Sequence, residues 1–318
     1  MYIWLFSDME INNRILIADD IHPIFIEQAE EMGYTCDYQP TIKLDGALQI
    51  IGDYAGLVIR SKFNVDKQII DAAANLRFVC RAGAGMDNID VPYAEEKNIA
   101  LINASEGNMD AVGEHAVGLL LALMNHFNTA DAEIRNGQWR REANRGFELK
   151  GKTVGIIGYG FMGKSFAKKL SGFEVEVIAY DKYKTGFSDR YAREVSMEEI
   201  VKHSDVLSVH VPLTAETNGM INDELLFHFK KPIFFINTSR GKVAKVRAVL
   251  NAVKAGKILG AGLDVLETEK FPALAEQEWF DDLKKSNKII LTPHVAGWTF
   301  ESYRKISEVM AAKLGELR

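Results

Sequence analysis

Cysteine is scarce in this chain of 318 residues, since only Cys36 and Cys80 occur. They form no CxxC pair, and no histidine stands at the spacing from them that a zinc site uses. A disulfide scaffold is therefore excluded and no metal site is expected. Both cysteines are predicted to be reduced side chains in a core.

Long apolar runs are missing as well. The longest, VGLLLALM at 117–124, is far shorter than the roughly 18 residues that cross a bilayer. The apolar start MYIWLF has no basic residue before it and is followed by Asp8 and Glu10, which is not the pattern of a secretory signal. We interpret residues 1–13 as a short extension and expect a cytoplasmic protein without a membrane partner.

Excess positive charge is the third absence, because 38 lysines and arginines against 44 acidic residues give a formal net charge of −6 at pH 7. Such a chain has no long-range attraction to nucleic acid or to anionic lipid, so neither is expected as a partner. The composition that is present, 47% hydrophobic and 26% charged, is typical of globular proteins. The chain is too long for one ordinary core, which predicts two domains.

Short β-rich runs alternate with helical patterns, which predicts an α/β fold with parallel sheets covered on both faces. A first series of strands is expected at 14–18, 56–59, 76–80 and 99–102. A second series, after a helical stretch at 108–136, is expected at 153–158, 175–180, 205–211, 232–238, 258–265 and 288–292. Six strands in this alternation make a full doubly wound sheet. The last helix, at about 300–317, is expected to return to the first domain.

The strongest motif is GYGFMG at 158–163, directly after an apolar strand and before a helix. Its glycines permit a tight turn and close approach of the backbone to a pyrophosphate. Asp181 ends the next strand, where a carboxylate accepts hydrogen bonds from the adenosine ribose and repels a 2′-phosphate. NAD is therefore the predicted cofactor. Lys182 and Lys184 could soften that repulsion, so NADP stays open as an alternative, as does a tight turn without nucleotide.

Three further polar segments follow strands, at 237–241, 262–269 and 292–297. They place a cation, Arg240, an acid, Glu269, and a base, His294, at strand ends, where ligands bind in open α/β sheets. A histidine exchanges protons near neutrality, a carboxylate orients it, and a guanidinium binds a substrate carboxylate. Taken singly, each residue could be an ordinary surface side chain. Together they predict a catalytic site rather than surface decoration.

This ordered set of motifs resembles the D-isomer-specific 2-hydroxyacid dehydrogenase family, and within it phosphoglycerate dehydrogenases, over nearly the whole chain after residue 13. The resemblance implies an α/β fold with two doubly wound domains. One is a flavodoxin-like substrate-binding (catalytic) domain at 1–105 plus 295–318, and the other is a Rossmann NAD-binding domain at 106–294. Arg240, Glu269 and His294 are implied to be the catalytic residues.

The resemblance also implies two sets of binding residues. The cofactor-binding residues are expected to be Gly158, Gly160, Phe161, Met162, Gly163, Asp181, His210, Val211, Pro212, Thr217, Thr238, Ser239, Arg240, Asp264, His294 and Gly297. The substrate-binding residues are expected to be Arg60, Ser61, Lys62, Ala82, Gly83 and Asn108. Small residues at 82–85 would leave backbone N–H groups free for a carboxylate. The cluster at 60–62 is able to take a phosphate, although a solvated basic turn explains it almost as well.

The implied reaction interconverts a D-2-hydroxy acid and its 2-keto acid with NAD, most specifically 3-phosphoglycerate and 3-phosphohydroxypyruvate in serine biosynthesis. A glyoxylate or hydroxypyruvate reductase is the nearest alternative, and an NADH-sensing corepressor-like scaffold is an alternative of another class. Trp139 is implied to be buried against a second copy in a homodimer. The chain ends at Arg318, so no C-terminal regulatory domain is expected.

Two positions depart from the family pattern. Lys270 stands where proline usually follows the catalytic glutamate, which is expected to loosen the loop that presents Glu269. The run KVAKVRAV after Arg240 lacks the acidic residue that usually opens the next helix, a loss of an N-cap worth about 1 kcal/mol. Glu114 and His115 are interpreted as structural residues.

Overall fold

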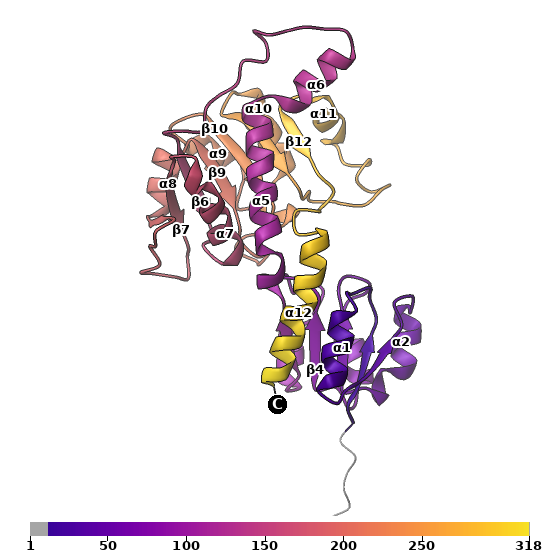
Figure 1. The fold of residues 1–318 in the computed structure, drawn as a ribbon. Helices are drawn as coiled ribbons and strands as arrows, with labels where there is room; N and C mark the ends of the chain where they lie inside the picture. The colour runs from indigo at the N-terminus through magenta and orange to yellow at the C-terminus, as the bar shows by residue number, and fades with distance from the viewer. Residues whose placement is uncertain (1–11, 318) are drawn as a thin grey trace, which may run out of the picture. The chain divides into compact units, whose positions relative to one another are not determined.

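The computed structural model describes residues 12–317, which Figure 1 shows as a ribbon. The extension predicted over residues 1–13 lies, as far as residue 11, outside the described residues. The described chain divides into two compact units, residues 12–108 with 300–317, and residues 109–299. Among the described residues, no helix has the length and apolar character that spanning a membrane requires.

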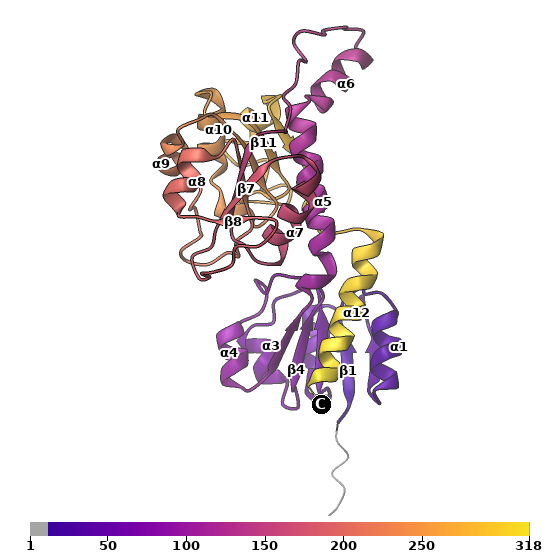
Figure 2. The ribbon, with the colours of Figure 1, turned by 60° about the vertical axis from the view of Figure 1, so that its left-hand side comes forward.

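The first unit is built on a parallel five-stranded sheet of order β2-β1-β3-β4-β5, which is the flavodoxin-like order. Its strands are β1 (Arg14–Ile17), β2 (Thr35–Tyr38), β3 (Gly56–Ile59), β4 (Phe78–Arg81) and β5 (Ala100–Asn103). Figure 2 shows helices on both faces of this sheet. One face packs on α1 (Ile24–Glu31) and α12 (Phe300–Glu316). The other packs on α2 (Leu44–Ile50), α3 (Lys67–Ala72) and α4 (Val91–Glu96).

The second unit is built on a parallel seven-stranded sheet of order β12-β11-β10-β9-β6-β7-β8. Its strands are β6 (Thr153–Ile157), β7 (Glu176–Tyr180), β8 (Arg193–Glu194), β9 (Val206–Val209), β10 (Ile233–Asn237), β11 (Ile258–Leu263) and β12 (Ile289–Leu291). Counted from β6, this is the Rossmann order 3-2-1-4-5-6 with one strand added. The order reverses between β6 and β9, and a dinucleotide binds outside such a reversal point.

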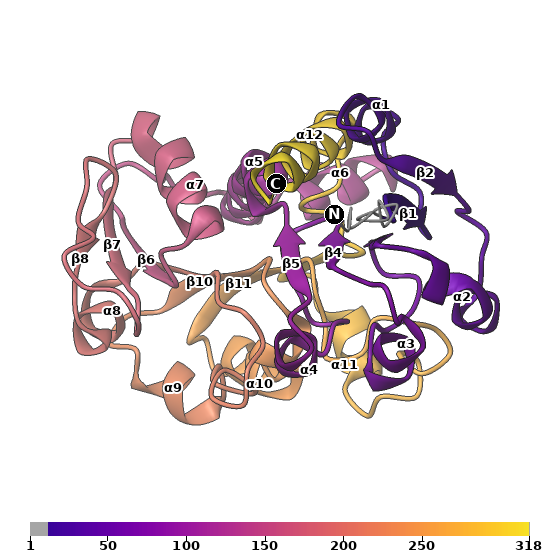
Figure 3. The same cartoon turned by 90° about the horizontal axis from the view of Figure 1, so that it is seen from below.

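Helices cover both faces of the second sheet, as the view in Figure 3 shows. One face packs on α5 (Ser105–Met124) and α7 (Phe161–Lys169). The other packs on α8 (Met197–His203), α9 (Asp223–His228) and α10 (Val246–Lys254). The remaining helices of this unit are α6 (Phe127–Arg135) and α11 (Phe280–Lys285). The predicted α/β fold of two doubly wound units is confirmed.

Two strands were not predicted from the sequence, and both lie at sheet edges. β2 pairs only with β1 and has no buried residue, while β8 has two residues and pairs only with β7. Neither carries the apolar run that a strand buried on both faces requires. The helical stretch predicted at 108–136 is also divided, because His126 adopts a left-handed φ of +53° between α5 and α6.

The two compact units divide after residues 108 and 299, whereas the predicted boundaries were 105/106 and 294/295. The first turn of α5 packs on α12, since a Cβ on Gly107 would lie 2.6 Å from the backbone of Ile306. Residues 295 and 296 stay with the second unit because their backbone N–H groups both donate to Asp264.

Candidate active site

The turn after β6 needs glycine for two different reasons. Gly158 has φ +92°, and a Cβ on it would lie 2.6 Å from the carbonyl oxygen of His210 and 2.9 Å from Val211. A Cβ on Gly163 would lie 2.1 Å from the Gly158 carbonyl oxygen, so α7 packs directly on the turn. Around Gly160, the N-cap of α7, an added Cβ would meet no atom within 4 Å. This opening at a helix N-terminus fits a pyrophosphate.

Two apolar residues follow Gly160 at the start of α7. Phe161 is half exposed and Met162 is partly buried. Asp181 follows β7, and its Oδ2 accepts a hydrogen bond from the backbone N–H of Tyr159 at 2.9 Å, while its Oδ1 accepts from that of Tyr183 at 3.0 Å. A carboxylate offers about four acceptor positions, so Asp181 retains capacity for ribose hydroxyls.

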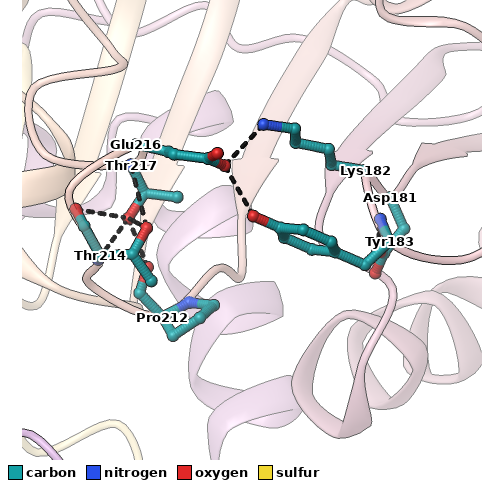
Figure 4. Close-up of polar contacts among 7 residues, drawn as sticks. All are labelled: Asp181, Lys182, Tyr183, Pro212, Thr214, Glu216 and Thr217. Carbon is teal, nitrogen blue, oxygen red and sulfur yellow. Dashed lines mark hydrogen bonds and ion pairs between the residues drawn. The ribbon is translucent and has the colours of Figure 1, made fainter.

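Both lysines of the turn after β7 are engaged. Lys182 Nζ lies 2.6 Å from Oε2 of Glu216, and the Tyr183 hydroxyl donates to the same oxygen at 2.6 Å (Figure 4). Lys184 Nζ donates to the carbonyl oxygen of Tyr159 at 3.1 Å. The Lys182 ammonium and the Tyr183 hydroxyl lower the pKa of the Glu216 carboxyl, so this acid is charged near neutrality.

The loop after β9 is ordered by its own hydroxyl groups. Thr217 Oγ1 donates to the carbonyl oxygen of Pro212 at 2.6 Å and accepts from the backbone N–H of Thr214 at 2.8 Å (Figure 4). The His210 ring folds back toward β9, with its Nε2 2.8 Å from Oγ of Ser208. Burial lowers the pKa of His210 to about 4, so the ring is neutral at physiological pH.

His294 and Glu269 form a direct pair, with 2.9 Å between Nδ1 of the histidine and Oε2 of the glutamate. Glu269 lies in the loop after β11, His294 in the turn after β12, and Arg240 directly after the loop that ends β10. The hydrogen bond with Glu269 raises the pKa of His294, while burial and the charge of Arg240 lower it. The three predicted catalytic side chains therefore lie at adjacent strand ends, and both Glu269 and Arg240 affect the pKa of His294.

Asp264 holds the turn that carries His294. It is almost fully buried, and its two carboxylate oxygens accept from the backbone N–H groups of Val295 and Ala296, each at 2.9 Å. Its carbonyl oxygen accepts from the backbone N–H of His294 at 2.8 Å. His294 has a left-handed φ of +55°, which non-glycine residues seldom adopt. The three bonds to one aspartate fix that conformation.

His115 belongs to the same network, which its position in the sequence did not reveal. Its Nε2 lies 3.0 Å from Oγ1 of Thr292 and 3.7 Å from Oδ1 of Asp264. The Thr292 hydroxyl in turn donates to Oδ1 of Asp264 at 2.5 Å. His115 and Thr292 are 177 residues apart, so no local spacing could have linked them. Glu114, by contrast, pairs with Lys169 at 2.8 Å on α7.

The segment between β10 and Arg240 is buried, and the side chain of Asn237 stabilises its turn. Oδ1 of Asn237 accepts from the backbone N–H of Ser239 at 3.0 Å and from its hydroxyl at 2.8 Å. Thr238 is buried, and its Oγ1 has no hydrogen-bond partner among the described residues. Gly297 directly follows the turn that Asp264 holds. Asn237 was not among the predicted site residues, although it precedes Arg240 by only three positions.

Residues 117–296 match the family model of the D-isomer specific 2-hydroxyacid dehydrogenase NAD binding domain. The chain belongs to this family. NAD is accordingly the cofactor of the second unit.

Relatives of this chain are named for different substrates. The D-3-phosphoglycerate dehydrogenase of Archaeoglobus fulgidus is 33% identical over 94% of this chain and 56% of its own length. The hydroxypyruvate reductase of Thermotoga maritima is 35% identical over 90% of both chains. A crystal structure of D-lactate dehydrogenase from Aquifex aeolicus, complexed with NAD and lactic acid, has a TM-score of 0.81 at 25% identity and covers 96% of this chain and 95% of its own. The chain thus spans little more than half of the first relative's length and most of the second's.

The basic loop of the first unit, residues 60–62, is held by a buried acid from the end of another strand, which was not predicted. Asp19 follows β1, and its Oδ2 accepts from the backbone N–H groups of Arg60, Ser61 and Lys62 at 2.8, 2.9 and 3.0 Å. Asp19 is only 6% exposed. A phosphate at this loop would therefore find these three backbone donors already occupied, and the Lys62 ammonium donates to the carbonyl oxygen of Pro40.

The loop after β4 also differs from the expectation of free backbone donors. The Ala82 N–H donates to the carbonyl oxygen of Ile59, and the Gly83 N–H to that of Arg81, each at 2.8 Å. These two groups are therefore not open to a carboxylate, which corrects the prediction. Gly83 has φ +146°, and a Cβ on it would lie 1.7 Å from the Arg81 guanidinium. Asn108 lies in the first turns of α5, with its Oδ1 buried and unpartnered among the described residues.

Proposed function

We propose that this dehydrogenase interconverts a D-2-hydroxy acid and the matching 2-keto acid with NAD, and that Arg240, Glu269 and His294 are its catalytic residues. The observation that carries the proposal is the 2.9 Å contact between His294 Nδ1 and Glu269 Oε2. It commits one ring nitrogen to the carboxylate and leaves Nε2 as the atom that exchanges a proton with substrate.

NADH, when bound, supplies the hydride that reduces the keto carbon. In the reductive direction the imidazolium of His294 gives the Nε2 proton to the keto oxygen, and in the oxidative direction the neutral ring removes the hydroxyl proton. Glu269 stabilises the imidazolium, which is why the pKa of His294 is raised. Arg240 carries the planar guanidinium fork that is suited to bind the substrate carboxylate and polarise the keto group.

We assign the cofactor to the carboxyl edge of the second sheet. The opening at Gly160 would hold the pyrophosphate, and Asp181 the adenosine ribose. The loop from Val211 to Thr217 would line the adenine, and the buried segment 237–239 with Asp264 would support the nicotinamide end. His210 would take part through its backbone, since its ring is turned into the sheet edge.

The leading substrate is 3-phosphoglycerate, which would place the enzyme in serine biosynthesis. The support is the basic loop at 60–62, where Arg60 and Lys62 would bind the phosphate through their side chains. Asp19 favours the second candidate, an unphosphorylated acid such as glyoxylate or hydroxypyruvate, because its carboxylate occupies the backbone donors of that loop and adds negative charge beside it. The loop at 82–85 and Asn108 are proposed to face the substrate in either case.

A substrate panel with Arg60→Ala decides between these candidates. If the phosphate binds there, Arg60→Ala raises KM for 3-phosphoglycerate by about tenfold or more, as expected for loss of a charge-assisted contact, and leaves KM for hydroxypyruvate nearly unchanged. Arg77→Ala is the matched control. Arg77 lies before the first residue of β4, at the other edge of the sheet from the loop at 60–62, and it contacts residues 12 and 13. An unchanged KM in Arg60→Ala rules out the phosphate site.

The same panel tests the reaction itself. His294→Ala is expected to bind NADH and lose about 10²- to 10⁴-fold in kcat. NADH binding by the unaltered protein without turnover of any 2-keto acid would favour the corepressor-like scaffold instead.

We also propose that the protein is a homodimer joined through α6 and the segment that follows it. Trp139 is 80% exposed, and Phe127 and Ile134 of α6 are more than half exposed. Large apolar side chains gathered on one protruding segment are typical of an interface. Figure 1 shows α6 and the chain after it extending away from the second sheet.

A further inference from the structure

The turn after β7 and the loop after β9 are joined by one surface contact. Glu216 receives both the Lys182 ammonium and the Tyr183 hydroxyl at its Oε2, each at 2.6 Å. Figure 4 shows Lys182 and Tyr183 reaching from one side and Glu216 from the other. The Lys182 and Glu216 side chains are 55% and 54% exposed, so the pair lies in solvent at the same edge as Asp181.

The position of this contact matters because of what surrounds Asp181. A cation beside the ribose carboxylate is what a 2′-phosphate needs, since the carboxylate alone repels it. Lys182 is the next residue after Asp181, but its charge is already compensated by Glu216. The Tyr183 hydroxyl donates to the same oxygen and holds the carboxylate toward the lysine. Lys184, the other lysine of the turn, donates to a main-chain carbonyl oxygen.

We propose that Glu216 is a second determinant of cofactor choice, which disfavours NADP by neutralising Lys182. Asp181 repels the 2′-phosphate directly, and Glu216 removes the neighbouring cation that would offset this repulsion. The inference rests on the proposed placement of the adenosine ribose at Asp181. It concerns cofactor binding only and does not depend on which acid is the substrate.

The test compares dissociation constants for NADH and NADPH, measured by the change in protein fluorescence. Glu216→Gln removes the charge and keeps a side chain of the same shape. We expect the dissociation constant for NADPH to fall by about threefold to tenfold, the range for one partly screened charge facing a doubly charged phosphate. The dissociation constant for NADH is expected to change by less than about twofold. The gain shrinks in high salt, because the pair is exposed.

Two further variants separate the release of Lys182 from a general change in protein charge. Glu176→Gln makes the same change in net charge at the opposite end of β7, where Glu176 pairs with Arg193 at 2.8 Å and is equally exposed. It is expected to leave the NADPH to NADH ratio unchanged. Lys182→Gln placed on Glu216→Gln is expected to abolish the gain, because the released cation is then missing.

The outcomes distinguish the role of Glu216 from the placement of the ribose on which it rests. If Asp181→Asn leaves both affinities unchanged, the ribose does not lie at Asp181 and the proposed cofactor site is wrong. If Asp181→Asn relaxes the preference for NADH, but Glu216→Gln behaves like Glu176→Gln, the site holds and Glu216 plays no part in selection. Retention of the gain in the double variant overturns the role of Lys182.

Discussion

At the residue scale, His294 combines a left-handed backbone conformation with a side chain that contacts the Glu269 carboxylate. The backbone conformation is held by three hydrogen bonds to Asp264, and the ring by one hydrogen bond to Glu269. A histidine on a mobile loop would lose orientation each time it changed its charge. In this structure Asp264 holds the main chain and Glu269 holds the ring. The ring would therefore keep its orientation when it gains or loses a proton.

This arrangement predicts how pH affects the rate. The hydrogen bond with Glu269 raises the pKa of His294, so Glu269→Gln lowers it. Reduction needs the imidazolium, and its rate falls as pH rises through that pKa. In Glu269→Gln the fall is expected at lower pH than in the unaltered enzyme. Oxidation needs the neutral ring, so its rise is also expected at lower pH. Profiles of kcat against pH in both directions measure the shift.

The control for this prediction is Glu276→Gln, which removes the charge of an exposed acid in the same segment. Its pH profiles are expected to match those of the unaltered enzyme. If Glu269→Gln lowers kcat at every pH without moving the pH at which kcat changes, Glu269 orients the ring without setting the pKa of His294.

At the element scale, helix α10 shows how the chain compensates for a missing cap. Its N-cap, Lys245, makes no capping hydrogen bond, as the sequence predicted. The structure supplies an acid from elsewhere, because the backbone N–H of Val246 donates to Oε2 of Glu267 at 2.7 Å. Glu267 lies two residues before Glu269. The contact therefore also ties the loop that presents Glu269 to a helix. This is the loop in which Lys270 stands at the position where the family pattern has proline.

Glu267→Ala is expected to affect stability and catalysis together. Loss of the acceptor should lower the free energy of unfolding by about 1 kcal/mol. Release of the loop should lower kcat severalfold, because a small displacement of Glu269 changes the orientation of His294. Chemical denaturation and steady-state kinetics measure the two effects.

Ser196→Ala provides the comparison. Ser196 caps α8 with a reciprocal bond to Glu199, away from the loop that carries Glu269. We expect a similar loss of stability with kcat unchanged. Equal behaviour of the two variants would mean that Glu267 serves only as a cap.

The elements themselves were largely predictable, and the exceptions have a common cause. The strands of the sheet interiors are buried on both faces, so they appear in the sequence as continuous apolar runs such as TVGII and IFFIN. β2 and β8 lie at edges, where one side of the strand needs no partner and polar residues are tolerated. Periodicity could not separate them from loops.

At the scale of the whole molecule, the order of the motifs along the chain could be predicted from the sequence. Which backbone N–H groups are already hydrogen-bonded could not. The sequence placed Arg240, Glu269 and His294 after successive strands, and in a parallel sheet this brings them to one edge. It could not reveal that Asp19 takes the backbone donors of a loop 41 to 43 residues away. It also missed that Ala82 and Gly83 donate to their own sheet edge. Such pairings depend on register and side-chain direction, which one sequence does not contain.

The largest arrangement left to test is the homodimer. Exposure of Trp139, Phe127 and Ile134 leaves apolar area in water, at a cost of about 25 cal/mol per Å². Pairing of two copies through this segment removes the cost, so light scattering at micromolar concentration is expected to give twice the mass of one chain. Trp139→Ala should shift the protein toward monomer.

Phe227→Ala is the control for that shift, because Phe227 is an exposed aromatic residue on α9, which covers the opposite face of the sheet from α5. Its mass is expected to stay that of the unaltered protein. A monomeric unaltered protein would contradict the dimer outright, while a dimer that survives Trp139→Ala would place the interface elsewhere. Because the pair of His294 and Glu269 and the proposed cofactor edge are both contained in the second unit, Trp139→Ala should bind NADH as tightly as the unaltered protein even when it is monomeric.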